Sequence, residues 1–199
     1  MEDKNLTQNE SLEIISRMIK ETRNNMERGG GNIFLLWGYV CLAVSLAVYS
    51  LLSNTGDYRF NWLWFAIPVI GYPGMIYMLK KREKGAITIV SRVISNIWIV
   101  LGIVAGLLSI YMFVDYKAYP IMFVMALLIN SGVAISGLVI RFRPIVVAGF
   151  LGILLSFGML MVAGINQILI FALLAVIMLI IPGHILNNAS RKVKAENNA

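Results

Sequence analysis

Hydrophobic and polar positions along the chain fall into long apolar runs that are separated by short polar segments. A helix needs about 20 consecutive apolar residues to cross a hydrocarbon core of roughly 30 Å. Six runs of about this length or longer cover residues 32–53, 62–79, 87–114, 120–140, 144–162 and 166–186. Uniformly apolar runs of this length are typical of membrane-spanning helices rather than of strands. The pattern therefore predicts an all-α, polytopic membrane protein with six transmembrane helices.

The segment before the first run, residues 1–31, has an amphipathic pattern instead. Thr7 and Glu10 have the spacing of a capping box, and three glycines at residues 29–31 form a hinge that ends the predicted helix. Its apolar stripe consists of Leu12, Ile15, Ile19 and Met26. The stripe could cover the bilayer interface, the cytoplasmic face of the bundle or another copy of the chain. Balanced charge and the lack of aromatic residues favour contact with protein, so we predict a cytoplasmic arm that mediates self-association or partner binding.

The apolar runs also resemble one another in pairs. The odd-numbered runs contain "GYVCLAVS", "GIVAGLLS" and "GFLGILLS", each with glycine and serine seven residues apart, on one helix face. The even-numbered runs contain "YPGMIYMLKKR", "ISGLVIRFR" and "IPGHILNNASRK". The aligned glycines are Gly38, Gly102 and Gly149 in the odd runs and Gly74, Gly137 and Gly183 in the even runs. This predicts a membrane domain over residues 32–187 built from three parallel hairpin repeats, followed by a tail over residues 188–199.

Composition and charge agree with a membrane protein. The chain has 59% hydrophobic residues, 14% charged residues and a mean hydropathy of +0.79. Of the 17 lysines and arginines, only Arg59 and Lys117 lie in the loops on the side opposite the termini. The positive-inside rule therefore predicts that both termini lie in the cytoplasm, and we expect a multi-pass protein of the cell (inner) membrane. The net charge of +7 then marks topology and contact with membrane lipid, and we expect no nucleic-acid partner.

The candidate chemistry of the runs is sparse. Ionisable side chains are nearly absent from their interiors, which argues against proton or sodium coupling. The polar candidates for a cavity or for interhelical hydrogen bonds are Asn96, Asn130, Ser131 and His184. Interhelical bonding is the favoured interpretation. Pro68, Pro73 and Pro182 are predicted to hinge or kink the even-numbered helices. One histidine and one cysteine cannot form a zinc site, so we expect no metal or cofactor.

Three functions are compatible with these features. We expect a non-enzymatic structural, interaction or envelope-response protein, and the alternative is a transporter or channel for a small or lipophilic solute along the axis between the hairpins, near Asn130. An intramembrane enzyme that uses Ser131 and His184 is the third and weakest hypothesis, because the G-x-S-G motif of rhomboid-type proteases is missing around Ser131. The sequence identifies no small-molecule ligand.

Three segments together, "ESLEIISRMIKETRNNMERGGGNIFLLWGY", "WFAIPVIGYPGMIYMLKKRE" and "LIFALLAVIMLIIPGHILNN", carry a resemblance. The chain resembles a family of uncharacterised small bacterial six-helix integral membrane proteins with an N-terminal amphipathic helix. Genes of that family often lie beside small winged-helix regulators, which implies a regulated role in the cell envelope. The three-hairpin plan is also similar, in architecture alone, to that of six-helix membrane proteins of acid resistance. Neither resemblance transfers a functional residue.

Overall fold

The computed structural model describes residues 12–17, 30–80, 89–114, 120–139 and 141–196. These residues are almost entirely helical, and none of them is in a β-strand. The helices are α2 (Gly30–Thr55), the 3₁₀-helix η1 (Tyr58–Phe65), α3 (Ala66–Lys80), α4 (Ile89–Val114), α5 (Ile121–Val139), α6 (Arg143–Gly158), the 3₁₀-turn η2 (Met159–Met161), α7 (Asn166–Ala175), the π-helix η3 (Val176–Ile180) and α8 (Ile181–Glu196). Six helical segments are long and apolar enough to span a membrane. The prediction of an all-helical, multi-pass membrane protein is therefore confirmed.

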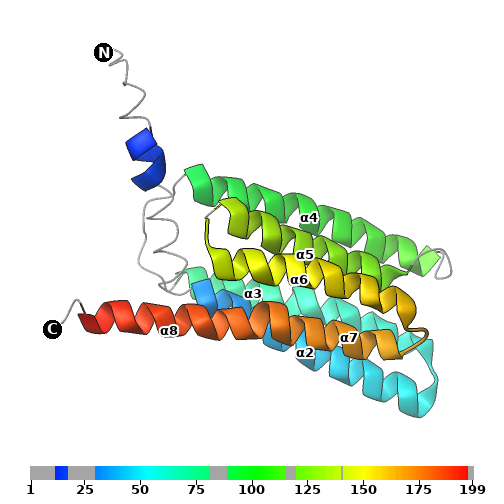
Figure 1. Cartoon of the computed structure of the whole chain (residues 1–199). Coiled ribbons are helices and arrows are strands. Elements are labelled where there is room, and N and C mark those ends of the chain that lie inside the picture. Colours follow the sequence, from blue (N-terminus) through cyan, green and yellow to red (C-terminus); the bar gives the residue numbers. More distant parts are fainter. Residues whose placement is uncertain (1–11, 18–29, 81–88, 115–119, 140, 197–199) are drawn as a thin grey trace.

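The six spans run side by side along the bundle (Figure 1). Helices α2, α4 and α6 begin at one end of the bundle, and α3, α5 and α8 end there. We call this end the basic end, because Lys80, Arg92, Arg141 and Arg143 lie at the helix termini that meet there. Arg59, in η1, lies at the opposite end. The structure thus keeps most described basic residues at a single end of the apolar bundle.

The turn between α2 and η1 uses residues suited to a sharp reversal. Gly56 has a φ of +66°, in the left-handed region that favours glycine. Asp57 caps η1, and its side-chain Oδ1 accepts a hydrogen bond from the backbone N–H of Arg59 at 2.9 Å. These two contributions let α2 end and the second span begin within three residues.

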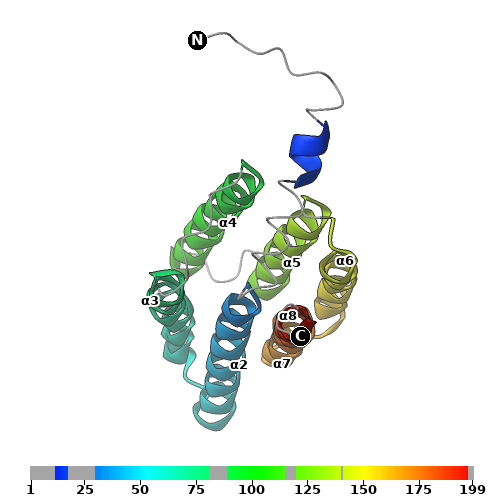
Figure 2. The same ribbon diagram turned by 90° about the vertical axis from the view of Figure 1, so that its left-hand side faces the viewer.

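The contacts between neighbouring spans differ in extent around the bundle. Figure 2 looks at the bundle from the basic end and shows the order α3, α2, α7–α8, α6, α5 and α4. The most extensive contacts join α5 to α6 and join α2 to α7, η3 and α8. Helices α3 and α4 are neighbours in this view but make no more than marginal contact with each other. No residue in the Arg92–Tyr111 part of α4 is fully buried, so most of its surface is left for lipid or another partner.

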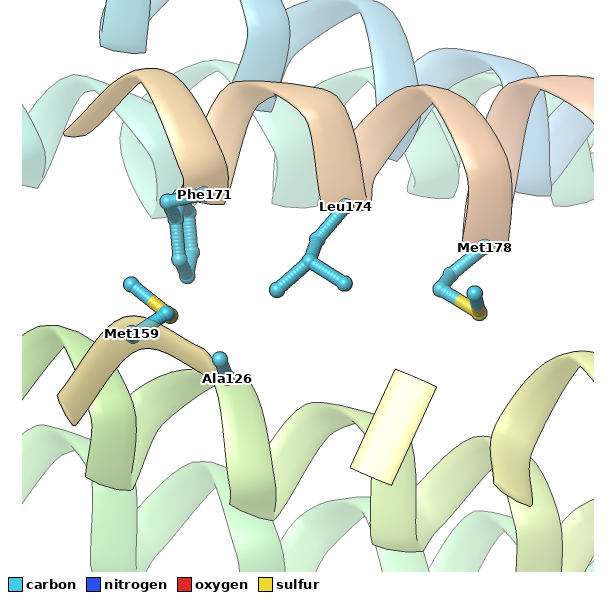
Figure 3. Packing of buried hydrophobic residues seen from close by; sticks show 5 residues of the cluster. All are labelled: Ala126, Met159, Phe171, Leu174 and Met178. Atoms are coloured by element: carbon cyan, nitrogen blue, oxygen red, sulfur yellow. The ribbon is translucent and has the colours of Figure 1, made fainter. Parts of the chain in front are cut away.

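The hydrophobic core lies among α2 and the last three spans. Figure 3 shows Phe171, Leu174 and Met178 on α7 and η3 directed toward Met159 and Ala126, and these five residues form one buried cluster. A second cluster joins α2 to α7 through Val44, Val48, Leu52 and Ile168. A third joins α5, α6 and α8 through Val133, Ile145 and Leu186. The buried residues of the three clusters therefore lie on α2 and on the last three spans, and the partly buried Ile94 of α4 packs against the third cluster.

Glycine provides the closest contacts between these helices. A Cβ atom added at Gly149 of α6 would lie 2.5 Å from the Cα of Ala134 on α5, and one added at Gly38 of α2 would lie 2.7 Å from Cγ1 of Ile180 in η3. At Gly102 of α4 the nearest atom is the hydroxyl of Tyr72 on α3, at 3.4 Å. Real side chains do not approach as closely as the first two distances, so these helices pack together because glycine has no side chain.

The three prolines of the kink prediction occupy different places in their helices. Pro68 is the third residue of α3, which continues directly from the 3₁₀-helix η1. Pro73 lies inside α3. Pro182 is the second residue of α8 and directly follows the π-helix η3. The amide of Ile181 donates to the carbonyl of Val176, one residue farther back than in an α-helix. Kinking at these sites stays a prediction.

Two segments extend beyond the predicted apolar runs. The chain from Tyr58 to Phe65, which includes the start of the second run at residue 62, is a 3₁₀-helix. At the other terminus α8 continues to Glu196, so most of the predicted tail over residues 188–199 is helical.

Candidate functional site

Asn130 is a buried polar residue at the contact between α5 and α6. Its side chain is 2% exposed, and its Nδ2 donates a hydrogen bond to Ser156 Oγ at 3.1 Å. Ser156 Oγ in turn donates to the carbonyl of Gly152 at 2.7 Å. A Cβ atom at Gly152 would lie 2.5 Å from Asn130 Cγ, so glycine makes the room that the asparagine fills. Asn130 therefore joins two helices through a satisfied hydrogen bond.

The free space beside Asn130 is small. A cavity of about 20 Å³ lies between α2, α5, α7 and η3, and Cys41, Asn130 and Leu174 are among its lining residues. Such a volume holds about one water molecule. The alternative function of transport near Asn130 would require the helices around this point to separate, because this arrangement has no room for a solute there.

His184 lies far from Asn130 in a different environment. It is exposed on α8, and its Nε2 is 3.1 Å from the hydroxyl of Tyr39 on α2. The two rings also meet edge to face, with centroids 6.4 Å apart. Nearby in sequence, Asn187 Nδ2 donates to Asn32 Oδ1 at 2.7 Å. These two polar pairs join α8 to α2 toward the basic end of the bundle.

The remaining predicted polar residues do not gather around either pair. Ser131 follows Asn130 on α5 and is half-buried, whereas Asn96 is exposed on α4. The partner that the structure gives His184 is Tyr39 rather than Ser131. Among the described residues, no group of three or more His, Cys, Asp or Glu side chains could hold a metal ion.

Trp98 makes a polar contact that the sequence patterns did not indicate. Its indole Nε1 donates to Ser136 Oγ at 3.1 Å, from α4 to α5. A Cβ atom at Gly132, also on α5, would lie 3.3 Å from the Trp98 ring. The aligned even runs do single out position 136, where serine stands in place of proline, but they give no indication that tryptophan is its partner.

A surface groove of about 430 Å³ runs between α2 and α3. Its lining is almost wholly apolar and extends along α2 from Asn32 to Val44, with Ile70 and Met78 contributed by α3. Tyr39 and Ile70 are about half exposed, so the groove opens sideways, away from the bundle. Nothing in the spacing of residues in the sequence predicted this groove.

The N-terminal arm is described over residues 12–17, which are helical and lie outside the bundle (Figure 1). Leu12 is 65% exposed and Ile15 is 52% exposed. Ile19 and Met26, the other members of the predicted stripe, lie outside the described residues. The described part of the stripe is therefore not covered by the bundle.

In comparisons with protein-family models, curated proteins and solved structures, none matches this chain. The resemblance to small six-helix membrane proteins stays a prediction.

Proposed function

We propose that this protein is a non-enzymatic integral membrane protein of the cell (inner) membrane, whose N-terminal helix mediates self-association or partner binding. The observation that carries the proposal is the exposed apolar stripe of the arm. Leu12 and Ile15 lie on one face of a helix that the six-helix bundle does not cover. Two large apolar side chains on a short, exposed helix gain free energy when another protein surface removes them from water.

The orientation proposed for the bundle has the basic end in the cytoplasm. Lys80, Arg92, Arg141 and Arg143 are at the basic end and Arg59 is at the other. An excess of lysine and arginine marks the cytoplasmic side of a membrane protein. In this orientation the arm precedes α2 on the cytoplasmic side, where soluble partners can reach it.

The bundle is proposed to consist of three equivalent hairpins, α2–α3, α4–α5 and α6–α7–α8. The aligned glycines support this. Gly149 approaches Ala134, which lies three residues before Gly137, the aligned glycine of the preceding even span. Gly38 approaches Ile180, which lies three residues before Gly183, the aligned glycine of the last span. The aligned serines each donate to the carbonyl four residues back, but serine does this in many helices, so the glycine contacts carry more weight.

The experiment for the arm measures the mass of the protein without its bound detergent by light scattering. The mass of the full-length protein is expected to exceed that of a monomer. Deletion of residues 1–28 is expected to reduce the mass to that of a single chain. A full-length Leu12→Ser/Ile15→Ser variant should have the same effect, because it removes the stripe and keeps the arm. Glu13→Ser, between the two positions, is the matched control and should leave the mass unchanged.

The outcome of this experiment also separates self-association from partner binding. A full chain that is already monomeric, but that captures a specific protein only when Leu12 and Ile15 are present, supports partner binding. If neither mass nor capture depends on these two residues, the proposed role of the arm is wrong.

A further inference from the structure

The groove between α2 and α3 has a shape and polarity that correspond to a class of ligand. We propose that it binds an acyl chain of an anionic phospholipid from the membrane leaflet at the basic end, with the lipid head group beside Asn32 and Lys80. This inference rests on the groove and is independent of the role of the N-terminal arm.

The length of the groove agrees with the thickness of one leaflet. Its lining on α2 extends from Asn32 to Val44, and these two residues are about 18 Å apart along the helix at a rise of 1.5 Å per residue. One leaflet contributes half of a hydrocarbon core of roughly 30 Å, or about 15 Å. Asn32 lies in the first turn of α2 at the basic end. The groove therefore extends from the membrane interface to about the bilayer centre.

The volume of the groove favours a single chain over a helix. A helix about 10–12 Å wide and 18 Å long occupies on the order of 1,400 Å³, which is well above the volume of the groove, about 430 Å³. A partner helix could therefore lie over the groove but could not enter it. An acyl chain is narrower, and lipids fill the surroundings of any groove that opens to the bilayer, as this one does at Tyr39 and Ile70.

The polar groups of the groove are distributed as an amphiphile requires. Val40, Ala43, Val44 and Ile70 line its deeper part, and the amide of Asn32 lies at the basic end. Because Asn32 Oδ1 already accepts a hydrogen bond from Asn187, its Nδ2 is the group left to donate to a phosphate or ester oxygen.

Charge at the same end favours an anionic head group. Lys80 is exposed at the end of α3, two residues after Met78, which lines the groove. In the sequence it is followed by Lys81 and Arg82, which lie outside the described residues. Cationic side chains at the membrane surface attract anionic lipids. Phosphatidylglycerol is therefore a suitable probe, and phosphatidylcholine, with the same chains and no net charge, is its control.

The experiment is native mass spectrometry of the full chain in detergent, with equimolar phosphatidylglycerol and phosphatidylcholine of identical acyl chains. The wild-type protein is expected to retain phosphatidylglycerol about fivefold better. Ala43→Phe, which fills the groove from α2, should abolish most of this retention. Lys80→Gln should remove the preference between the two lipids but keep the binding of the chain.

Matched variants separate the groove from the rest of the lipid-facing surface. Ala47 is also exposed on α2 but does not line the groove, so Ala47→Phe should retain lipid as the wild type does. Ile70→Phe obstructs the groove from α3, with exposed Ile76→Phe as its control. This second pair provides the test if Ala43→Phe fails to fold by circular dichroism.

Two results would overturn the proposal. Equal retention of both lipids by the wild type would show that no anionic head group is recognised. Equal retention by the groove variants and their controls would show that the bound lipid lies elsewhere on the bundle.

Discussion

Replacing Gly149 by alanine tests how closely α5 and α6 depend on a glycine contact. The added Cβ would lie 2.5 Å from Ala134 Cα and 2.7 Å from Ala134 Cβ, whereas ordinary contacts begin at 3.4 Å. The two helices must therefore move apart by about 0.9 Å, and a gap of that size loses roughly a quarter to a half of the dispersion energy of each contact. The nearest atoms belong to the backbone of Ala134, so no side-chain rotation can relieve the overlap.

The expected cost follows from two opposing terms. Overpacking in a closely packed region destabilises by about 1–3 kcal/mol, and the better helix propensity of alanine returns up to about 1 kcal/mol. We therefore expect Gly149→Ala to lower the free energy of unfolding by up to about 2 kcal/mol, and by about 1–3 kcal/mol more than a glycine-to-alanine change that meets no neighbouring atom. The measurement is dodecyl sulfate unfolding in mixed micelles, followed by far-ultraviolet circular dichroism.

The matched control for this prediction is Gly106→Ala on α4. A Cβ atom at Gly106 would meet no other atom within 4 Å, so the change should be neutral or should stabilise by up to about 1 kcal/mol. If the Gly149→Ala variant is as stable as the Gly106→Ala variant, α5 and α6 are not in the close contact at Gly149 on which this prediction is based.

Two further predictions concern the buried residues of the last three spans. A double-mutant cycle between Asn130→Ala and Ser156→Ala should give a coupling energy of about 0.6–1.7 kcal/mol in the same unfolding assay, because each change removes one partner of the same hydrogen bond; additive effects would contradict the bond. Met159→Ala should destabilise by about 2–5 kcal/mol, since Met159 is 0% exposed in the core. Met161→Ala, at a 90% exposed position two residues away, should change stability by less than about 0.5 kcal/mol, and equal losses would refute the placement of the core.

The number and approximate positions of the spans could be predicted because membrane insertion depends on the summed hydropathy of about 20 residues, a quantity that the sequence gives directly. Helix ends are less predictable. The apolar run ends near residue 186, but α8 continues to Glu196, because lysine, arginine, alanine and glutamate are good helix formers outside a membrane. Hydropathy marks where the chain leaves the apolar pattern, which is not where the helix ends.

The partners of the polar residues could not be predicted from the sequence. The sequence identifies Asn130 as a residue that needs a hydrogen-bond partner, but Ser156 lies 26 residues away on another helix. Tyr39 and His184 are separated by 145 residues, and the side-by-side position of α2 and α8 brings them together. Pairings over such distances depend on the order of the helices around the bundle, for which local patterns contain no information.

Two aromatic residues account for the weak contact between α3 and α4 if the three hairpins are equivalent. Gly71 occupies the position on α3 that Ala134 and Ile180 occupy on their own helices, so Gly102 of α4 should approach it. The Trp37 ring of α2 lies over Gly71 instead, so close that a Cβ atom there would be 2.6 Å from its Cη2. Trp37 also meets the Tyr72 ring edge to face at 5.4 Å. Two bulky aromatic side chains therefore occupy the space in which two backbones would otherwise meet, and the atom nearest to a Cβ added at Gly102 is the Tyr72 hydroxyl. Glycine at both positions is not sufficient for close packing when a neighbouring helix supplies a ring between them.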